Sequence, residues 1–308
     1  MHATTPRRAL AGLALALAAG AAPAADMPVQ LPGARQFDMA AEGSGPRYRI
    51  FVSEPDAPAP AAGYPVLYVL DGNAAFPVAA FLARSVASRR EVTGQAPLLV
   101  VGIGYPGDAD FDVAARRRDY TVGVAEPGAA GREGGAERFL DFVERELKPR
   151  IAARHPVDTQ RQALFGHSFG GLLVLHAAFT RPASFTTFVA SSPSIWWNGR
   201  RVLDGLQQPP AAVPRLQLSV GALEDTPPPG RLSPERLALL AERSMVGEAR
   251  ALATRLQALP AWQGRFAFHE FDGENHGWVW LPALSRGLQF FLDQPAAPAS
   301  GARQEDAS

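Results

Sequence analysis

The residues Gly166–Gly170 read Gly-His-Ser-Phe-Gly, which has the form Gly-x-Ser-x-Gly. An apolar, strand-like run precedes this motif and an amphipathic helical pattern follows it, which is the setting of a nucleophile elbow. In such a turn the glycines let strand and helix pass closely, and the first helix amides favour negative charge near the serine. We therefore predict that Ser168 is a catalytic nucleophile. The alternative is a glycine-rich turn in which this serine only caps the helix.

A serine hydroxyl becomes a good nucleophile only when a neighbouring base removes its proton. His276 lies in the polar loop 271–277, after a predicted strand and before the last predicted helix. Hydrolases with a nucleophile elbow place their base there, so we predict His276 as the general base. His167 adjoins the serine, and the turn is expected to direct its ring away from the nucleophile. The other histidines lie in the N-terminal segment, at helix positions or inside a strand: His2, His155, His176 and His269.

An acid that orients the histidine is expected after a strand that lies between the two residues in the chain. The predicted strand over residues 215–220 is followed by Gly-Ala-Leu-Glu-Asp, so Glu224 or Asp225 could accept a hydrogen bond from the imidazole. We favour Glu224 from the chain order and offset typical of such triads. Asp225 in this role, or a Ser–His dyad without an acid, stays open.

Backbone amides must stabilise the oxyanion that forms when a serine attacks an ester carbonyl. The amide of Phe169, directly after the nucleophile, is expected to donate one hydrogen bond. A second donor should come from the loop after the first parallel strand, which reads Asp-Gly-Asn-Ala over residues 71–74. We choose Asn73 for it, with Gly72 next.

The chain pattern indicates how these residues are brought together. Apolar runs alternate with helical patterns after an initial hairpin over residues 36–53, which predicts a mostly parallel sheet with helices on both faces. This is the α/β class, with the α/β-hydrolase fold, and its sites lie at the carboxyl ends of the strands. Strands are expected over 65–70, 97–103, 162–166, 186–190, 215–220 and 265–271, and helices over 74–90, from 136, 168–180, 234–259 and 281–292.

Some stretches have no clear period. Residues 106–135 are polar and glycine-rich and are interpreted as a long loop, and residues 193–213 as irregular. The tail 294–308 is rich in Ala, Pro and Ser and is expected to be disordered. Residues 26–293 are therefore predicted to form one hydrolase domain.

The first 25 residues have the pattern of a secretory signal peptide. Arg7 and Arg8 precede an apolar stretch over 9–20, and small residues follow at 22–24. This stretch is too short to span a membrane. We expect a periplasmic or secreted protein without stable membrane insertion; whether the general or the twin-arginine route exports it stays open.

Composition excludes several classes of function. The 30 basic and 30 acidic side chains balance, so nothing favours a nucleic acid as partner. The chain has no cysteine, which rules out disulfides, thiolate metal sites and a cysteine nucleophile. Serine chemistry needs no metal, and none is expected as a cofactor.

Several motifs together resemble a known family. These are Leu-Asp-Gly-Asn at 70–73, Arg-Arg-Asp-Tyr-Thr at 117–121, the elbow at 166–171, Ser-Pro-Ser-Ile-Trp-Trp-Asn at 192–198 and Gly-Glu-Asn-His-Gly at 273–277. The chain resembles the enterobactin/salmochelin esterases within the esterase-D-like α/β-hydrolases over about residues 35–293. The resemblance implies hydrolysis of the trilactone of catecholate siderophores, with Ser168 as nucleophile and His276 as base.

The substrate implied by this resemblance suggests what its binding site should offer. A ferric tris-catecholate carries a net charge of about −3 and three aromatic rings, so cations and aromatic faces would suit it. Arg116, Arg117 and Arg118 could supply the cations, although such a run could also be a solvated surface. Trp196 and Trp197 could stack on catechol rings or be buried beside the site.

Three functions are weighed on these grounds. The first is an exported serine esterase that opens catecholate siderophores such as ferric enterobactin and releases iron, the iron being part of the substrate. The second is an exported carboxylesterase for acetyl or feruloyl carbohydrate esters or other small esters. The third, a binding protein without catalysis on a hydrolase scaffold, is disfavoured by the intact elbow and His276.

Overall fold

The computed structural model describes residues 26, 29–43, 45–206 and 213–293. The fold lies in the unit that begins at Leu31. The predicted signal peptide over 1–25 and the predicted tail over 294–308 lie outside the described residues.

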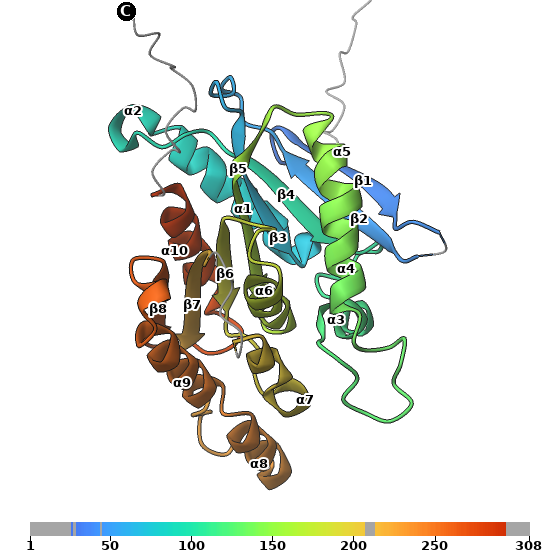
Figure 1. The fold of residues 1–308 in the computed structure, drawn as a ribbon, viewed down its shortest axis with the longest axis vertical. Helices are drawn as coiled ribbons and strands as arrows, with labels where there is room; N and C mark the ends of the chain where they lie inside the picture. Colours follow the sequence, from blue (N-terminus) through green and yellow to red (C-terminus); the bar gives the residue numbers. More distant parts are fainter. Residues whose placement is uncertain (1–25, 27–28, 44, 207–212, 294–308) are drawn as a thin grey trace, which may run out of the picture. The chain divides into compact units, whose positions relative to one another are not determined.

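The described residues form an eight-stranded sheet with the order β1-β2-β4-β3-β5-β6-β7-β8 (Figure 1). The pairs β1–β2 and β2–β4 are antiparallel, and every other neighbouring pair is parallel. The strands are β1 Ala34–Ala40, β2 Arg47–Ser53, β3 Tyr64–Leu70, β4 Leu99–Gly104, β5 Val157–His167, β6 Thr187–Ser191, β7 Arg215–Gly221 and β8 Phe266–Phe271. Together with the solved relatives described below, this confirms the predicted α/β-hydrolase fold.

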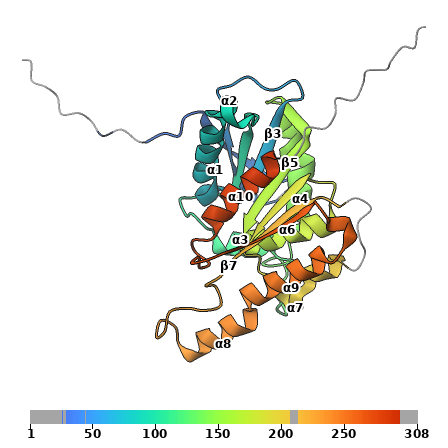
Figure 2. The ribbon, with the colours of Figure 1, turned by 90° about the vertical axis from the view of Figure 1, so that its left-hand side faces the viewer.

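The helices cover both faces of the sheet because alternate strand residues point to opposite sides. In β3, Leu67 and Val69 pack with α1 and α10, which lie on one face (Figure 2). Val66 and Tyr68 pack in the core that holds α4–α6 and α9 on the other face. The helices are α1 Gly72–Ala87, α2 Arg90–Thr93, α3 Val113–Tyr120, α4 Ala136–Phe142, α5 Lys148–Ala152, α6 Phe169–Thr180, α7 Trp197–Arg200, α8 Pro234–Arg243, α9 Met245–Gln257 and α10 Trp280–Leu292. A π turn, Val143–Leu147, and 3₁₀ turns at Arg201–Leu206 and Pro260–Trp262 complete the helical segments.

Three segments differ from the sequence-based expectation. The supposed loop over 106–135 contains α3, whose first turn is capped by the Asp112 carboxylate accepting from the Ala115 amide at 2.9 Å. The consecutive arginines 116–118 interrupt any apolar periodicity in this segment, so the sequence did not indicate a helix there. Residues 193–213, expected to be irregular, include α7 and a 3₁₀ turn. The expected helix 234–259 is two helices, because Ser244 takes a left-handed conformation with φ 43°.

The strand order explains why residues far apart in the chain can meet. Strands β5, β6, β7 and β8 are parallel neighbours in the sheet. Their carboxyl ends therefore form one edge, and the segments that follow them carry Ser168, Ser192, Glu224 and His276 in that order.

Candidate active site

Ser168 lies in a sharp turn between β5 and α6. Its backbone has φ 60° and ψ −117°, a conformation that costs energy for a residue with a side chain. The turn depends on its glycines: a Cβ at Gly166 would lie 2.4 Å from the carbonyl oxygen of Gly170. The amide of Ser168 donates to the Ser191 carbonyl at 3.0 Å. The strand and helix thus hold the serine in the strained geometry of the predicted elbow.

Ser168, His276 and Glu224 form a continuous chain of hydrogen bonds. Nε2 of His276 lies 3.0 Å from Oγ of Ser168, and its Nδ1 lies 2.6 Å from Oε2 of Glu224. The histidine side chain is 45% exposed and the glutamate side chain only 1%. One ring nitrogen therefore faces the hydroxyl and can accept its proton, while the other is fixed by a buried carboxylate.

The second oxygen of Glu224 is held just as firmly. Its Oε1 accepts a hydrogen bond from the Gly221 amide at 2.7 Å and another from the Ser192 hydroxyl. Ser192 is buried and has φ 42°, so its backbone is strained as well. Sequence reasoning missed this serine as a functional residue. The sequence signal that could have identified Ser192 was its position directly after a predicted parallel strand, as for Ser168, Glu224 and His276.

The neighbouring acid has a different role. Oδ2 of Asp225 accepts from the amides of Val246 and Gly247 at 2.9 and 3.4 Å. These amides lie in the first turn of α9, where backbone donors have no intrahelical partner. Of the two acids left open by the sequence, Glu224 contacts His276 and Asp225 anchors a helix.

The ring of His167 packs beside the ring of His276. Its ring centroid lies 4.6 Å from that of His276, and its Nδ1 lies 3.1 Å from Oγ of Ser191. Burial, together with the nearby His276 and Arg116, lowers the pKa of His167 well below its usual value. His167 is not among the described residues that line the pocket around Ser168, so the expectation that its ring is directed away from the nucleophile stays a prediction.

The predicted oxyanion donors lie in two places. Phe169 is the first residue of α6 and lines the pocket around Ser168. Gly72 and Asn73 open α1 directly after β3, but neither is among the described residues that line this pocket. The Asn73 side chain is bound to the end of β4, where its Oδ1 accepts from the Tyr105 amide at 2.9 Å.

Arg116 is the only one of the three candidate arginines among the described residues that line the pocket. Its Nε donates to Oδ1 of Asp71 at 2.7 Å, and its Nη2 donates to the His167 carbonyl at 3.3 Å. Burial opposes the charge on Arg116, yet Asp71 raises its pKa above the usual value. This guanidinium is a positive group whose charge is largely compensated by one carboxylate.

Arg117 and Arg118 line other hollows of the surface. Arg117 forms ion pairs with Glu133 and Glu126, the second at 2.9 Å. Arg118 pairs with Asp119 at 2.7 Å. All three arginines thus pair with carboxylates, and of the three only Arg116 is among the described residues that line the pocket around Ser168.

The pocket around Ser168 has a volume of about 300 Å³. Trp196 lines it, with its ring centroid 6.1 Å from that of Phe169. Trp197 is 5% exposed and packs edge-on against Phe169 at 5.2 Å. The pocket is lined by Arg116, Ser168, Phe169, Ser194, Trp196, Glu224, Leu240, Arg243, Met245 and His276.

Among the described residues, no three or more His, Asp or Glu side chains gather in an arrangement that could hold a metal ion. No helix among them has the length and apolar character needed to cross a bilayer.

Comparison with known proteins identifies the family. Residues 42–291 match the family described as "Putative esterase". The ferri-bacillibactin esterase BesA of Bacillus subtilis is 37% identical over 270 residues, covering 85% of this chain and 90% of that protein. The siderophore triacetylfusarinine C esterase of Aspergillus fumigatus is 37% identical over 290 residues, covering 87% and 96%. The crystal structure of the BES protein from Bacillus cereus superposes with a TM-score of 0.75 at 36% identity, covering 87% and 97%. These matches confirm the resemblance seen in the sequence: the chain belongs to this esterase family and is an ester-hydrolysing enzyme.

Proposed function

We propose that the protein is an exported serine esterase that hydrolyses the ester backbone of siderophores, of the catecholate trilactone type such as ferric enterobactin, and so releases their iron. The observation that carries the serine mechanism is the hydrogen-bonded chain from Ser168 through His276 to Glu224. Relatives named as esterases of ferri-bacillibactin, triacetylfusarinine C and enterobactin support a siderophore as the substrate.

The geometry supports a two-stage hydrolysis. Oγ of Ser168 attacks the ester carbonyl carbon while Nε2 of His276 takes the hydroxyl proton. Glu224 holds the imidazole in the required tautomer and stabilises the imidazolium that forms. The amide of Phe169 stabilises the oxyanion. A second donor from Gly72 or Asn73, which do not line the described pocket, stays a prediction. The imidazolium then gives its proton to the departing alkoxide, and water, deprotonated by His276, releases the acid and restores the serine.

Export is the part of the proposal that rests on residues 1–25 alone. Their two arginines, apolar stretch and small residues have the order that a signal peptidase recognises. Mass spectrometry of the protein from the periplasmic fraction or the medium should show a mature N-terminus close to residue 26. Intact protein confined to the cytoplasm would refute export and leave the esterase assignment untouched.

A fluorophosphonate probe and a panel of esters test the activity. The probe should label the wild-type protein at Ser168 and fail to label Ser168→Ala. Purified protein should hydrolyse ferric enterobactin with a higher kcat/KM than aryl acetates or feruloyl sugars. Faster turnover of the acetyl or feruloyl esters would favour the carbohydrate esterase instead, and absent labelling would favour a non-catalytic binding protein.

A further inference from the structure

The arginine without an acidic partner in the active-site pocket is Arg243, the last residue of α8. Among the described residues, no carboxylate forms an ion pair with its guanidinium, and its buried Nε has no hydrogen-bond partner. The pocket's other guanidinium, on Arg116, is already bound to Asp71 at 2.7 Å. A buried donor left without a partner is costly, so a group that supplies an acceptor would gain by binding there.

Three acids of the pocket wall and of α9, namely Glu224, Asp225 and Glu248, are engaged with other partners. Glu224 is held by His276, Ser192 and the Gly221 amide. Asp225 accepts from the first amides of α9. Glu248, one turn into α9, pairs with Arg200 at 2.6 Å. The positive charge at this wall of the pocket is therefore not compensated by these carboxylates.

Trp196 fixes the position of this guanidinium. The guanidinium carbon lies 4.4 Å from the centroid of the Trp196 ring, a cation–π stack. Trp196 in turn lies beside Phe169, the neighbour of the nucleophile. One face of the Trp196 ring is thus taken by the arginine, which changes its expected role from stacking on a substrate ring to supporting a cation.

The backbone also holds Arg243 at a defined corner. Ser244, with φ 43°, ends α8, and its amide donates to the Leu240 carbonyl at 3.0 Å. Met245 is buried at the start of α9 and lines the same pocket. Helix α8 itself has no buried residue and lies beyond α7 and α9 in both views (Figures 1 and 2). This outlying helix contributes Leu240 and Arg243 to the pocket.

We propose that Arg243, held on Trp196, is the specificity-determining cation of the pocket and binds the anionic oxygens of the ester substrate. The inference rests on the proposed function only for the choice of a catecholate as the anion. A planar guanidinium pairs with two adjacent oxygen atoms, such as those of a catecholate or a sulfonate. Arg116, Arg117 and Arg118 are replaced in this role by a residue on another helix.

Two matched pairs of esters test this. The first pair is 4-acetoxybenzenesulfonate and the neutral 4-acetoxybenzenesulfonamide, which differ in charge but little in size. The second pair is ferric enterobactin, with a charge of about −3, and the metal-free form with neutral catechols. The measured quantity is the ratio of kcat/KM for the anionic ester to that for its neutral partner.

Arg243→Gln should lower this ratio about 10- to 100-fold in at least one pair, chiefly through a higher KM for the anion. Arg243→Lys keeps the charge but loses the planar guanidinium that can pair with two oxygens, so it should lower the ratio less. Arg236→Gln, an exposed arginine earlier on α8, is the matched control and should leave the ratio unchanged.

Equal ratios for wild type and Arg243→Gln in both pairs would overturn the inference, provided the thermal midpoint shows a folded variant. Failure of the wild-type protein to hydrolyse either form of enterobactin would instead refute the proposed siderophore. The sulfonate pair alone then decides the role of Arg243, so the two failures are distinguishable.

Discussion

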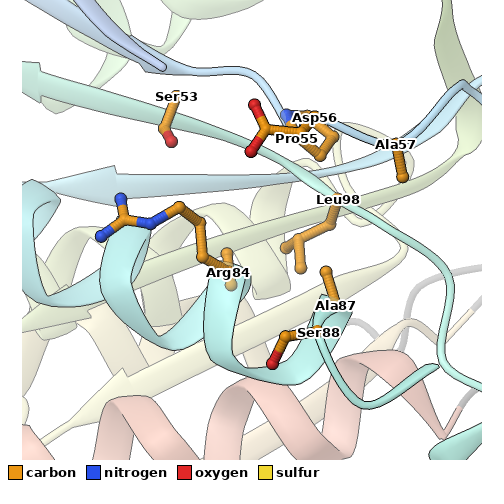
Figure 3. Close-up of a pocket in the computed structure, with 9 residues that line it drawn as sticks. Ser53, Pro55, Asp56, Ala57, Arg84, Ala87, Ser88 and Leu98 are labelled. Carbon is orange, nitrogen blue, oxygen red and sulfur yellow. The ribbon is translucent and has the colours of Figure 1, made fainter. Parts of the chain in front are cut away.

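Two hollows of similar size lie at opposite ends of the sheet. The pocket around Ser168 measures about 300 Å³ and lies at the carboxyl ends of β5 to β8. The other measures about 280 Å³ and lies near the amino end of β4, beside the last turn of α1. Figure 3 shows its polar side chains, among them Ser53, Asp56 and Arg84. It contains two serines, an acid and a cationic arginine, so its polar composition is comparable to that of the active-site pocket.

The difference lies in how the polar groups are connected. Around Ser168, each group contacts the next, from hydroxyl to imidazole to carboxylate. In the other hollow, Arg84 donates to the Pro32 carbonyl at 3.5 Å and Ser88 to the Ser85 carbonyl at 2.8 Å. Bonds to backbone oxygens activate no nucleophile, because no base receives the hydroxyl proton. Connected hydrogen bonds, rather than volume or composition, therefore distinguish the active site.

Removing one serine from each hollow should give the largest contrast. Ser168→Ala should lower kcat by about 10⁴- to 10⁶-fold, since the nucleophile is lost. Ser53→Ala should change kcat less than about twofold, because that hydroxyl has no base beside it. Ester hydrolysis by purified protein measures both. A comparable loss in the two variants would mean that the hollow near Arg84 takes part in the reaction.

The two adjacent acids sharpen the comparison within the site. Glu224→Gln should lower kcat by about 10²- to 10⁴-fold, because an amide cannot stabilise the imidazolium. Asp225→Ala should leave kcat within a few-fold and cost about 1 kcal/mol of unfolding free energy, because the first amides of α9 lose their acceptor. Steady-state kinetics and urea unfolding separate these effects. Unchanged activity in Glu224→Gln would indicate a Ser–His dyad.

Substitutions of Ser192 test how much its hydrogen bond to Glu224 contributes to activity. Ser192→Ala should lower kcat about tenfold with little change in KM, since Glu224 loses one of the donors that fix it. Ser192→Gly should lose as much activity while tolerating φ 42° better than alanine. If the glycine variant were fully active, the backbone conformation rather than the hydroxyl would be what matters.

The smallest effect concerns the pH dependence of stability. Burial keeps the pKa of His167 well below its ordinary 6.5, so the unfolded chain binds a proton there before the folded chain does. The contribution of this residue to unfolding free energy is therefore present above about pH 6.5 and is lost as pH falls below it. Below about pH 6.5, the unfolding free energy of the wild type should fall more steeply with decreasing pH than that of His167→Gln, by up to about 1.4 kcal/mol per pH unit. Denaturant unfolding between pH 4.5 and about 7.5 measures it, and parallel slopes would mean that His167 is protonated in the folded protein.

The sequence predicted most elements that carry the site but not all that shape it. The elbow, the runs that became β3 to β8 and the loop before His276 were read correctly, because glycine spacing and apolar runs are local signals. The arginine run that became α3 concealed a helix, and the break at Ser244 was missed. Neither is marked by a local apolar period: α3 begins at its cap on Asp112, and the corner lies at the left-handed backbone of Ser244.

Which side chains could react, and their order along the chain, could be read from local motifs, since a motif such as Gly-x-Ser-x-Gly depends on neighbouring residues. Only the tertiary structure decided which groups pair. Ser168 and His276, 108 positions apart, meet because parallel strands end at one edge of the sheet. In the same way it assigned Glu224 to the histidine and Asp225 to a helix, and within the described residues it paired Arg116, but not Arg243, with a carboxylate. Partner choice depends on packing across the fold, which no local pattern records.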